Sequence, residues 1–288
     1  MEKFLLLSAS LKQTKRGSDY FDVTLSGKDG AVTGKNWDGT IDMRDCVGKV
    51  IEVTGTLEEY NGEPQYNIRS FKVTDEDPSN YCVRSKYDIE TMYQHIGQFI
   101  GTVTNPELKG ILQEIFGKYG EEFKKHSCAL KNHHAFVGGL LQHTLCVTNS
   151  AHKLCSSYKQ ADRDVVITAA LLHDVGKLRE ISNFPNLEFT REGACMGHLV
   201  MSMLEVAPYL ERVTDGVTRD KLANCILAHH GQREWGSPVT PVCIEAWIVH
   251  VCDLLDARVE AIIEASERVE AGKLTAYIPS LGGSVIGV

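Results

Sequence analysis

Residues 165–177, VVITAALLHDVGK, decide the fold of the second part of the chain. Their apolar side chains recur at helical spacing, and His173 and Asp174 continue the face that a core would bury. Burial of such groups without partners costs several kcal/mol, by the order-of-magnitude rule for buried polar groups. The stretch therefore predicts a core helix. Its polar residues, His173 and Asp174, need polar partners or a bound ion to offset the cost of their burial.

Further helical segments each bring an imidazole or a carboxylate onto an apolar face. A lone histidine on such a face is usually a hydrogen-bonded core residue, but several on separate helices favour a shared metal centre. Neutral imidazole with carboxylate is a donor set that suits Fe, Mn, Zn or Ni. The groups are His143 in QHTLCV, His198 in GACMGHLV, the adjacent His229 and His230 in LANCILAHHG, and Asp253 in WIVHVCDLLDA.

The first part of the chain has a different pattern. Short runs rich in β-branched and aromatic residues alternate with glycine turns, which predicts strands of a small barrel. The runs are YFDVTLSG, AVTGKNW, KVIEVTGTLEEY and PQYNIRSFKV. After TDEDPSN the spacing becomes helical and remains so, and Asn105 before Pro106 predicts a capped helix start. We expect a barrel over residues 1–76, a linker over 77–84, an all-α domain over 85–272 and a tail over 273–288.

Composition narrows the class of protein. The 288 residues are 43% hydrophobic and 24% charged, as in soluble globular proteins, and no run approaches the about 20 apolar residues of a membrane span. The nine cysteines contain no CxxC pair, which favours free thiols and a cytoplasmic location. A net charge of -8 argues against coating of nucleic acid by bulk electrostatics, but leaves a local path around Lys131 and His133 open.

Four longer strings add a resemblance. HHAFVGGLLQHT, AALLHDVGKLREI, LAHHGQREWGSPVTP and EAWIVHVCDLLDAR resemble the HD superfamily of metal-dependent phosphohydrolases, and more narrowly the YhaM family of bacterial 3′-to-5′ exoribonucleases. That family joins an OB-fold to an HD domain, which agrees with the strand-then-helix partition. The resemblance implies a multidomain protein, with a small all-β OB-fold barrel followed by an all-α HD-type phosphohydrolase domain.

The resemblance also implies roles for the residues of the site. His143, His173, Asp174 and Asp253 would hold one divalent ion, and Asp174 would bridge to a second ion held by His198 with His229 or His230. Manganese is the first expectation for both ions, with Fe, Mg, Co, Ni or Zn as alternatives. Asp174 and Lys177 would act on the phosphodiester, with Lys177 contacting a phosphate oxygen. His133 or His134 would bind phosphate, and His134 would be the candidate proton donor.

The implied substrate is single-stranded RNA or DNA, and the implied products are nucleoside monophosphates. An OB-fold holds single strands by stacking bases on aromatic side chains, and Phe21, Trp37, Tyr60 and Tyr66 are the candidates. A homo-oligomer is plausible and a membrane partner is not expected. Two alternatives remain: a phosphohydrolase of small nucleotides or cyclic dinucleotides, and a nonenzymatic single-strand-binding replication factor.

Overall fold

A computed structural model describes residues 2–27, 30–39, 41–60, 63–130 and 134–288. The chain divides into two compact units. Residues 1–84 and 183–187 form a barrel unit, and residues 85–182 and 188–288 form a helical unit. The segment 77–84, which the sequence suggested as a linker, is thus grouped with the barrel.

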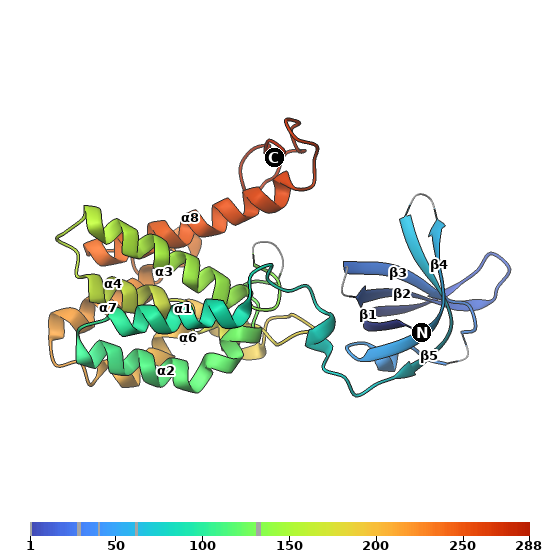
Figure 1. Cartoon of the computed structure of the whole chain (residues 1–288), viewed down its shortest axis with the longest axis horizontal. Coiled ribbons are helices and arrows are strands. Elements are labelled where there is room, and N and C mark those ends of the chain that lie inside the picture. Colours follow the sequence, from blue (N-terminus) through green and yellow to red (C-terminus); the bar gives the residue numbers. More distant parts are fainter. Residues whose placement is uncertain (1, 28–29, 40, 61–62, 131–133) are drawn as a thin grey trace. The chain divides into compact units, whose positions relative to one another are not determined.

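The barrel unit is a closed five-stranded barrel of OB-fold topology (Figure 1). Its strands follow the order β1-β2-β3-β5-β4, with β1 also pairing with β4 and a parallel β3–β5 pair among otherwise antiparallel neighbours. The strands are β1 (Glu2–Gln13), β2 (Asp19–Gly27), β3 (Gly30–Asn36), β4 (Val50–Tyr60) and β5 (Glu63–Val73). The expected barrel is confirmed.

The barrel core comes from alternation along the strands. In β2, Phe21, Val23 and Leu25 point inward and are buried, while the residues between them are less so. β1 was not singled out in the sequence, because its run FLLL lacks alternation. The structure explains that run: Phe4 and Leu6 pack in the main barrel core, and Leu5 packs in a second small cluster with Val50 and Tyr81.

The helical unit contains eight α-helices within the described residues. Its largest core cluster gathers side chains from α1, α2, α3, α4, α6, α7 and α8. The helices are α1 (Ile89–Thr102), α2 (Pro106–Lys125), α3 (Gly139–Ser157), α4 (Arg163–Leu172), α5 (Lys177–Glu180), α6 (Arg191–Leu210), α7 (Gly216–Ala228) and α8 (Ile244–Ser266). The C-terminal half of α8 extends beyond its neighbours (Figure 1).

Local chemistry sets where the helices begin. The Asn105 side chain accepts hydrogen bonds from the backbone N–H groups of Glu107 and Leu108, so the predicted cap of α2 is confirmed. The expected helix over 133–158 starts later, at Gly139, because His134 and Gly138 have positive φ angles of 59° and 82°. A right-handed helix cannot pass through that backbone.

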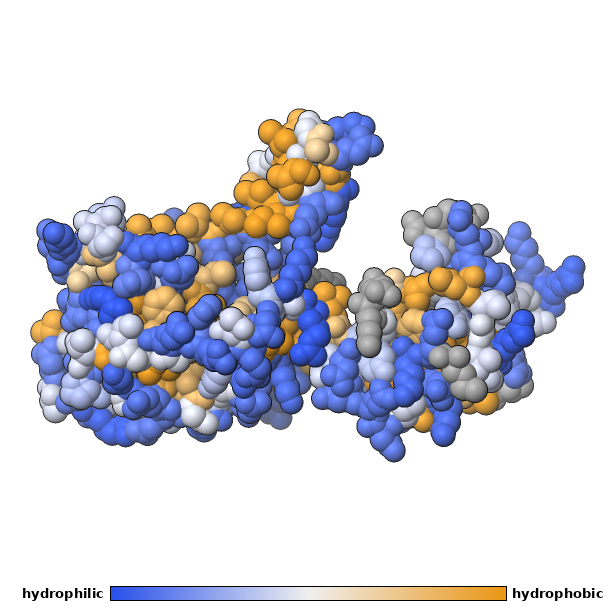
Figure 2. Space-filling model, viewed as in Figure 1, coloured by the Kyte–Doolittle hydropathy of each residue, from blue (hydrophilic) through white to orange (hydrophobic). Residues whose placement is uncertain are grey.

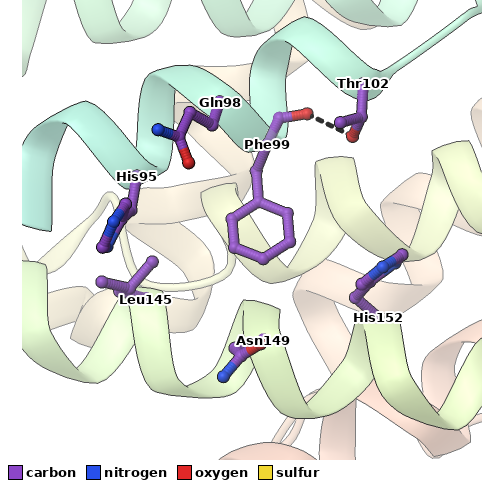
Figure 3. A pocket seen from close by; sticks show the side chains of 7 residues that line it. All are labelled: His95, Gln98, Phe99, Thr102, Leu145, Asn149 and His152. Carbon is purple, nitrogen blue, oxygen red and sulfur yellow. Dashed lines mark hydrogen bonds between the residues drawn. The ribbon is translucent and has the colours of Figure 1, made fainter.

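The surface carries two features of note. A hollow of about 450 Å³ lies between α1 and α3 and contains none of the predicted metal ligands (Figure 3). It is lined by His95, Gln98, Phe99, Thr102, Leu145, Asn149 and His152.

Hydrophobic side chains also form a band along α8 (Figure 2). Among the described residues, none of the helices has both the length and the apolarity that crossing a bilayer requires.

Candidate metal centre

The first group of metal donors gathers at one edge of Asp174. His143 Nε2 lies 3.2 Å from His173 Nε2 and 3.2 Å from Asp253 Oδ1. Asp174 Oδ2 lies 3.3 Å from His143 Nε2 and 3.4 Å from His173 Nε2. These four side chains come from α3, from the turn after α4 and from α8. Residues separated by up to 110 positions in the sequence therefore converge as predicted.

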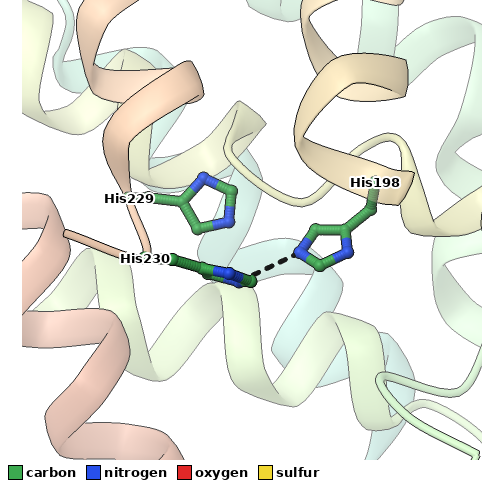
Figure 4. Close-up of side chains that lie close together, drawn as sticks. All are labelled: His198, His229 and His230. Atoms are coloured by element: carbon green, nitrogen blue, oxygen red, sulfur yellow. Dashed lines mark hydrogen bonds between the residues drawn. The ribbon is translucent and has the colours of Figure 1, made fainter. Parts of the chain in front are cut away.

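The second group gathers at the other edge of the same carboxylate. Asp174 Oδ1 lies 3.5 Å from His198 Nε2 and 3.6 Å from His229 Nε2. His198 Nε2 lies 3.1 Å from His230 Nε2, and Figure 4 shows the three rings turned toward one another. The sequence left His229 and His230 as alternatives, whereas the structure brings both to the group.

Each imidazole is held by its Nδ1 atom. His173, His229 and His230 donate Nδ1–H to backbone carbonyls, at 2.8, 2.7 and 3.0 Å. His143 and His198 donate it to the carboxylates of Asp256 and Glu180, at 2.7 and 2.9 Å. Since these acceptors carry no hydrogen, a neutral ring has its free lone pair on Nε2. All five lone pairs therefore face the centre, the orientation that metal-binding histidines adopt.

The middle of the centre contains buried polar atoms without partners. Asp174 Oδ1 and His229 Nε2 are buried and have no hydrogen-bond partner among the described residues. Such atoms are costly unless an unseen group satisfies them. Two ligands bound about 2.1 Å from one ion, at right angles, lie about 3 Å apart. The donor distances and the imidazole–carboxylate set therefore fit divalent metal ions on both sides of Asp174.

Electrostatics hold the carboxylate charged. Burial raises the pKa of Asp174, but the Lys177 ammonium and the neighbouring imidazole of His173 outweigh it and bring the pKa well below its ordinary value. Burial, with the nearby His173, brings the pKa of His229 well below its ordinary value. An ionised carboxylate beside a neutral imidazole is the protonation state that metal binding requires.

Gly176 in HDVGK allows the two groups to meet. A Cβ on this residue would lie 2.4 Å from the His198 carbonyl oxygen and 2.4 Å from the Ser202 nitrogen, both in the backbone of α6. The Gly176 N–H also donates to Ser202 Oγ at 2.9 Å. The glycine therefore lets α6 approach closely enough to place His198 beside Asp174.

Lys177, the predicted phosphate contact, is buried beside the centre. Its Nζ lies 2.7 Å from Asp174 Oδ2 and 3.3 Å from Cys128 Sγ. Burial lowers the pKa of Lys177, but the Asp174 carboxylate more than reverses this and raises it. The ammonium is thus a fixed positive charge at the edge of the donor groups.

Two supporting carboxylates were missed in the sequence. Asp256 accepts from His143 Nδ1 and, at 2.8 Å, from His134 Nε2. Glu180 accepts from both the backbone N–H and Nδ1 of His198. Asp256 could have been found from its spacing, since it follows Asp253 by one helical turn. Glu180 carried no comparable signal, because acidic residues after a lysine are common on exposed helices.

His134 has a different setting from the one expected for a loop residue. Its ring is buried, and its Nε2 bonds to the same Asp256 oxygen that fixes His143. The predicted proton-donor role of His134 stays a prediction. Lys131 and His133, the other basic residues suggested for nucleic acid, lie outside the described residues.

The barrel presents an exposed aromatic cluster. Trp37 is 50% exposed and Tyr60 is 58% exposed. The Tyr20 ring lies 4.9 Å from that of Trp37, and Lys35 Nζ lies 5.1 to 5.7 Å from all three ring centres. Tyr20 and Lys35 were missed in the sequence, since strand alternation does not reveal which residues of neighbouring strands meet. We call Tyr20, Lys35, Trp37 and Tyr60 the aromatic cluster.

Two of the four predicted stacking residues are wrong. Phe21 is 2% exposed and Tyr66 is 4% exposed, and both pack in the barrel core. Phe21 follows Tyr20 on the same strand, so its side chain points to the opposite face. Neither ring has a free face on which a base could stack.

Fold and site together define a class of protein: a hydrolytic enzyme of the HD type that binds divalent metal, with an OB-like barrel unit. Residues 140–258 match the HD domain family. That span contains every residue of both donor groups.

Curated relatives sharpen this class to a family. The chain is 30% identical to the 3′-5′ exoribonuclease YhaM of Bacillus licheniformis, over 98% of this chain and 92% of that protein. It is 31% identical to the YhaM of Bacillus pumilus, over 96% and 91% of the two chains, and 29% identical to that of Bacillus subtilis, over 98% and 92%. The chain belongs to the YhaM family of 3′-5′ exoribonucleases.

A solved structure also matches part of the chain. It is the second OB-fold domain of replication protein A from Methanococcus maripaludis, at 13% identity and a TM-score of 0.21, covering 26% of this chain and 82% of that one. The topology of the barrel unit is established by its own strand pairing.

Proposed function

We propose that this protein is a metal-dependent exoribonuclease that hydrolyses single-stranded RNA from the 3′ end to nucleoside monophosphates. The observation that carries the proposal is the pair of donor groups facing each other across Asp174. The names of the relatives, which span nearly the whole chain, support the reaction and its direction.

The centre is proposed to hold two divalent ions, with manganese as the first expectation. His143, His173, Asp174 Oδ2 and Asp253 would hold one ion, and Asp174 Oδ1, His198, His229 and His230 would hold the other. When bound, such ions supply Lewis-acid stabilisation of phosphoryl charge and lower the pKa of water. Oxygen-containing and imidazole donors of this kind suit Mn, Fe, Co, Ni or Zn, and Mg through the carboxylates.

The chain's own residues contribute position and charge. Lys177 adds a fixed ammonium beside Asp174, where an anionic phosphodiester must approach. Asp256 and Glu180 keep the rings of His143 and His198 in one orientation, so the donors are arranged before substrate arrives. The buried walls around Asp174 and His229 exclude bulk water and strengthen these interactions.

The aromatic cluster of the barrel is proposed to hold the strand. Exposed rings stack on any base, and each such contact contributes about 1 to 3 kcal/mol with little sequence preference. Lys35 lies among the three rings, where its charge attracts the phosphate backbone. A weak binding module on the same chain raises the local concentration of strand at the centre, which favours a polymer over a mononucleotide as substrate.

The location is proposed to be the cytoplasm. All nine cysteines are free thiols, as a reducing compartment requires.

A hydrolysis time course tests the proposal. Short RNA labelled at the 5′ end and, separately, at the 3′ end is incubated with Mn, Mg or a chelator. We expect a descending ladder from 5′-labelled RNA, immediate release of labelled mononucleotide from 3′-labelled RNA, and no reaction with chelator. The same assay on single-stranded DNA measures the preference between the two polymers.

The alternatives predict other outcomes. Intact RNA together with hydrolysis of a small nucleotide or cyclic dinucleotide would identify a small-substrate phosphohydrolase instead. A mononucleotide released first from the 5′ end would contradict the proposed direction. Rates that do not change with chelator would contradict the metal dependence.

A further inference from the structure

The outward face of α8 is lined mainly by apolar side chains, with Arg258 as the exposed charged residue among them. Its side chains between Ile244 and Ile262 recur every three or four residues, and each is 43% to 54% exposed. We call this set the α8 stripe: Ile244, Trp247, Val251, Leu255, Val259 and Ile262. A surface helix normally turns charged residues to water. α2 does so with Glu114, Lys118 and Glu121, whereas most of the outward residues of α8 are apolar.

The C-terminal tail enlarges the apolar surface. Leu274, Tyr277, Ile286 and Val288 are all more than 60% exposed. The Arg258 guanidinium of α8 donates to the Ser280 carbonyl, which ties the tail to the helix. Stripe and tail together expose on the order of 1,000 Å² of side chain, more than the about 300 to 600 Å² of the largest patch on a typical monomer. A contact that covers both the stripe and the tail would reach the about 800 Å² per partner that a stable interface buries.

The spacing of the α8 stripe is palindromic. The steps from Ile244 to Ile262 are three, four, four, four and three residues. In an antiparallel pair of α8 helices related by a two-fold axis near residue 253, each stripe residue meets another stripe residue. Val251 meets Leu255 of the partner subunit, Trp247 meets Val259 of the partner subunit, and Ile244 meets Ile262 of the partner subunit. A self-complementary surface of this kind is what a two-fold dimer requires.

Charge argues against other occupants of the stripe. Between Ile244 and Arg268, the acidic Glu245 is buried and Asp253 and Asp256 face the metal centre, which leaves three acidic side chains against two basic ones. The basic residues are Arg258 and Arg268. Helices that bind anionic membranes or nucleic acid carry an excess of Lys and Arg beside the contact face, and α8 has no such excess.

We propose that α8 is the interface of a homodimer in which the stripes of two chains pack antiparallel. The same helix carries Asp253 and Asp256, so the interface would also brace the helix that supplies one metal ligand and the acceptor for another. The proposal does not depend on the substrate of the enzyme.

Sedimentation velocity on the full chain tests the dimer. We expect the wild-type chain to sediment with twice its mass of 31.9 kDa. Val251→Lys and Leu255→Glu should each raise the dimer dissociation constant at least about 100-fold, since each places an unpaired charge in an apolar contact. The matched control is Leu204→Glu, which changes a side chain 53% exposed on α6 and outside the stripe. That variant should remain a dimer.

A mixture of the two variants tests the register. If Val251 meets Leu255 of the partner subunit, then Val251→Lys and Leu255→Glu chains should form a mixed dimer, because the lysine of one meets the glutamate of the other. Circular dichroism checks that each variant is folded. If one of the two is not, Ile262→Glu is used in its place. A wild-type chain that stays monomeric at its highest soluble concentration overturns the proposal, as does a Leu255→Glu chain that dimerises as tightly as wild type. A mixture that remains monomeric overturns the register.

Discussion

The metal centre and the aromatic cluster depart in opposite ways from the usual pattern, in which apolar side chains are buried and charged or polar ones are exposed. In the centre, carboxylates and imidazoles occupy a core where apolar side chains would be expected, and every ring is fixed by a named partner. In the barrel unit, the large rings of Trp37, just after β3, and Tyr60, at the end of β4, lie at the surface, although both strands contribute side chains to the core.

The difference reflects what each region must do. Bond cleavage needs charges at fixed positions away from bulk water, since electrostatic interactions weaken in a high dielectric. Holding a strand of any sequence needs exposed faces that tolerate different bases. The two regions should therefore respond differently to substitution. Changes in the metal centre should lower the hydrolysis rate of every substrate, whereas changes in the aromatic cluster should weaken only the reaction with the polymer.

The largest effect is expected at Asp174. Asp174→Ala removes the ligand shared by both donor groups, and hydrolysis of both RNA and a small activated diester should fall by at least about 100- to 1,000-fold, because one such electrostatic group is worth about 10² to 10³ in rate. Rates on both substrates and bound metal are measured. Asp220→Ala, a change of the same kind at an exposed helix position, should retain full activity. An Asp174→Ala protein that still cleaves the small diester would contradict the role of the metal centre in the hydrolysis of every substrate.

The next effect separates buried rings from exposed ones within the barrel. Phe21→Ala should cost about 3 to 5 kcal/mol of barrel stability, as deletion of a buried ring does. Trp37→Ala should cost little stability, since half of that side chain is already exposed. Denaturant unfolding followed by circular dichroism measures both. Equal losses would mean that Trp37 is part of the barrel core.

Asp256→Asn should have an intermediate effect. The amide still accepts from His143, but it lacks the negative charge that strengthens this ligand, so metal affinity should fall about 10- to 100-fold. Metal binding measured by calorimetry checks this directly. Excess metal should restore turnover of a small diester if Asp256 only positions His143. Turnover that stays low in saturating metal would contradict that role.

The smallest effect is expected at the aromatic cluster. Trp37→Ala should raise the KM for RNA about ten-fold, since one stacking contact is worth about 1 to 3 kcal/mol. Both kcat and KM for a small diester should stay unchanged. Leu57→Ala is the matched control: Leu57 is an exposed barrel residue that pairs with the buried Tyr66, on the face opposite to Asn67 and its partner Trp37. Equal losses on both substrates would remove the strand-binding role of Trp37.

Much of the helical unit could be predicted because its signals are local. The spacing around His143, His173 and Asp253 showed helices with polar groups on buried faces, and the structure brings these groups together. The start of α3 was predicted too early, because nothing in the letters HHAFVGG gives the positive φ of His134.

The rest depended on contacts between distant strands and helices. Alternation shows that Tyr20 and Phe21 lie on opposite faces of β2, but it does not say which face is the core. Lys35 joins the aromatic cluster only because β2 pairs with β3 and Tyr60 ends a neighbouring hairpin. Asp256 is paired with His143 across two helices, and a single sequence carries no mark of that partnership beyond the one-turn spacing from Asp253.

Substitution of Gly176 is expected to disturb the placement of the metal donors. Even a methyl group at this position would act as a wedge between α6 and the turn that carries Asp174. His198 would move away from Asp174, while His143 and Asp253, which lie on α3 and α8, would keep their places. The absence of a side chain at Gly176 thus allows both groups of metal donors to lie beside the same carboxylate, that of Asp174.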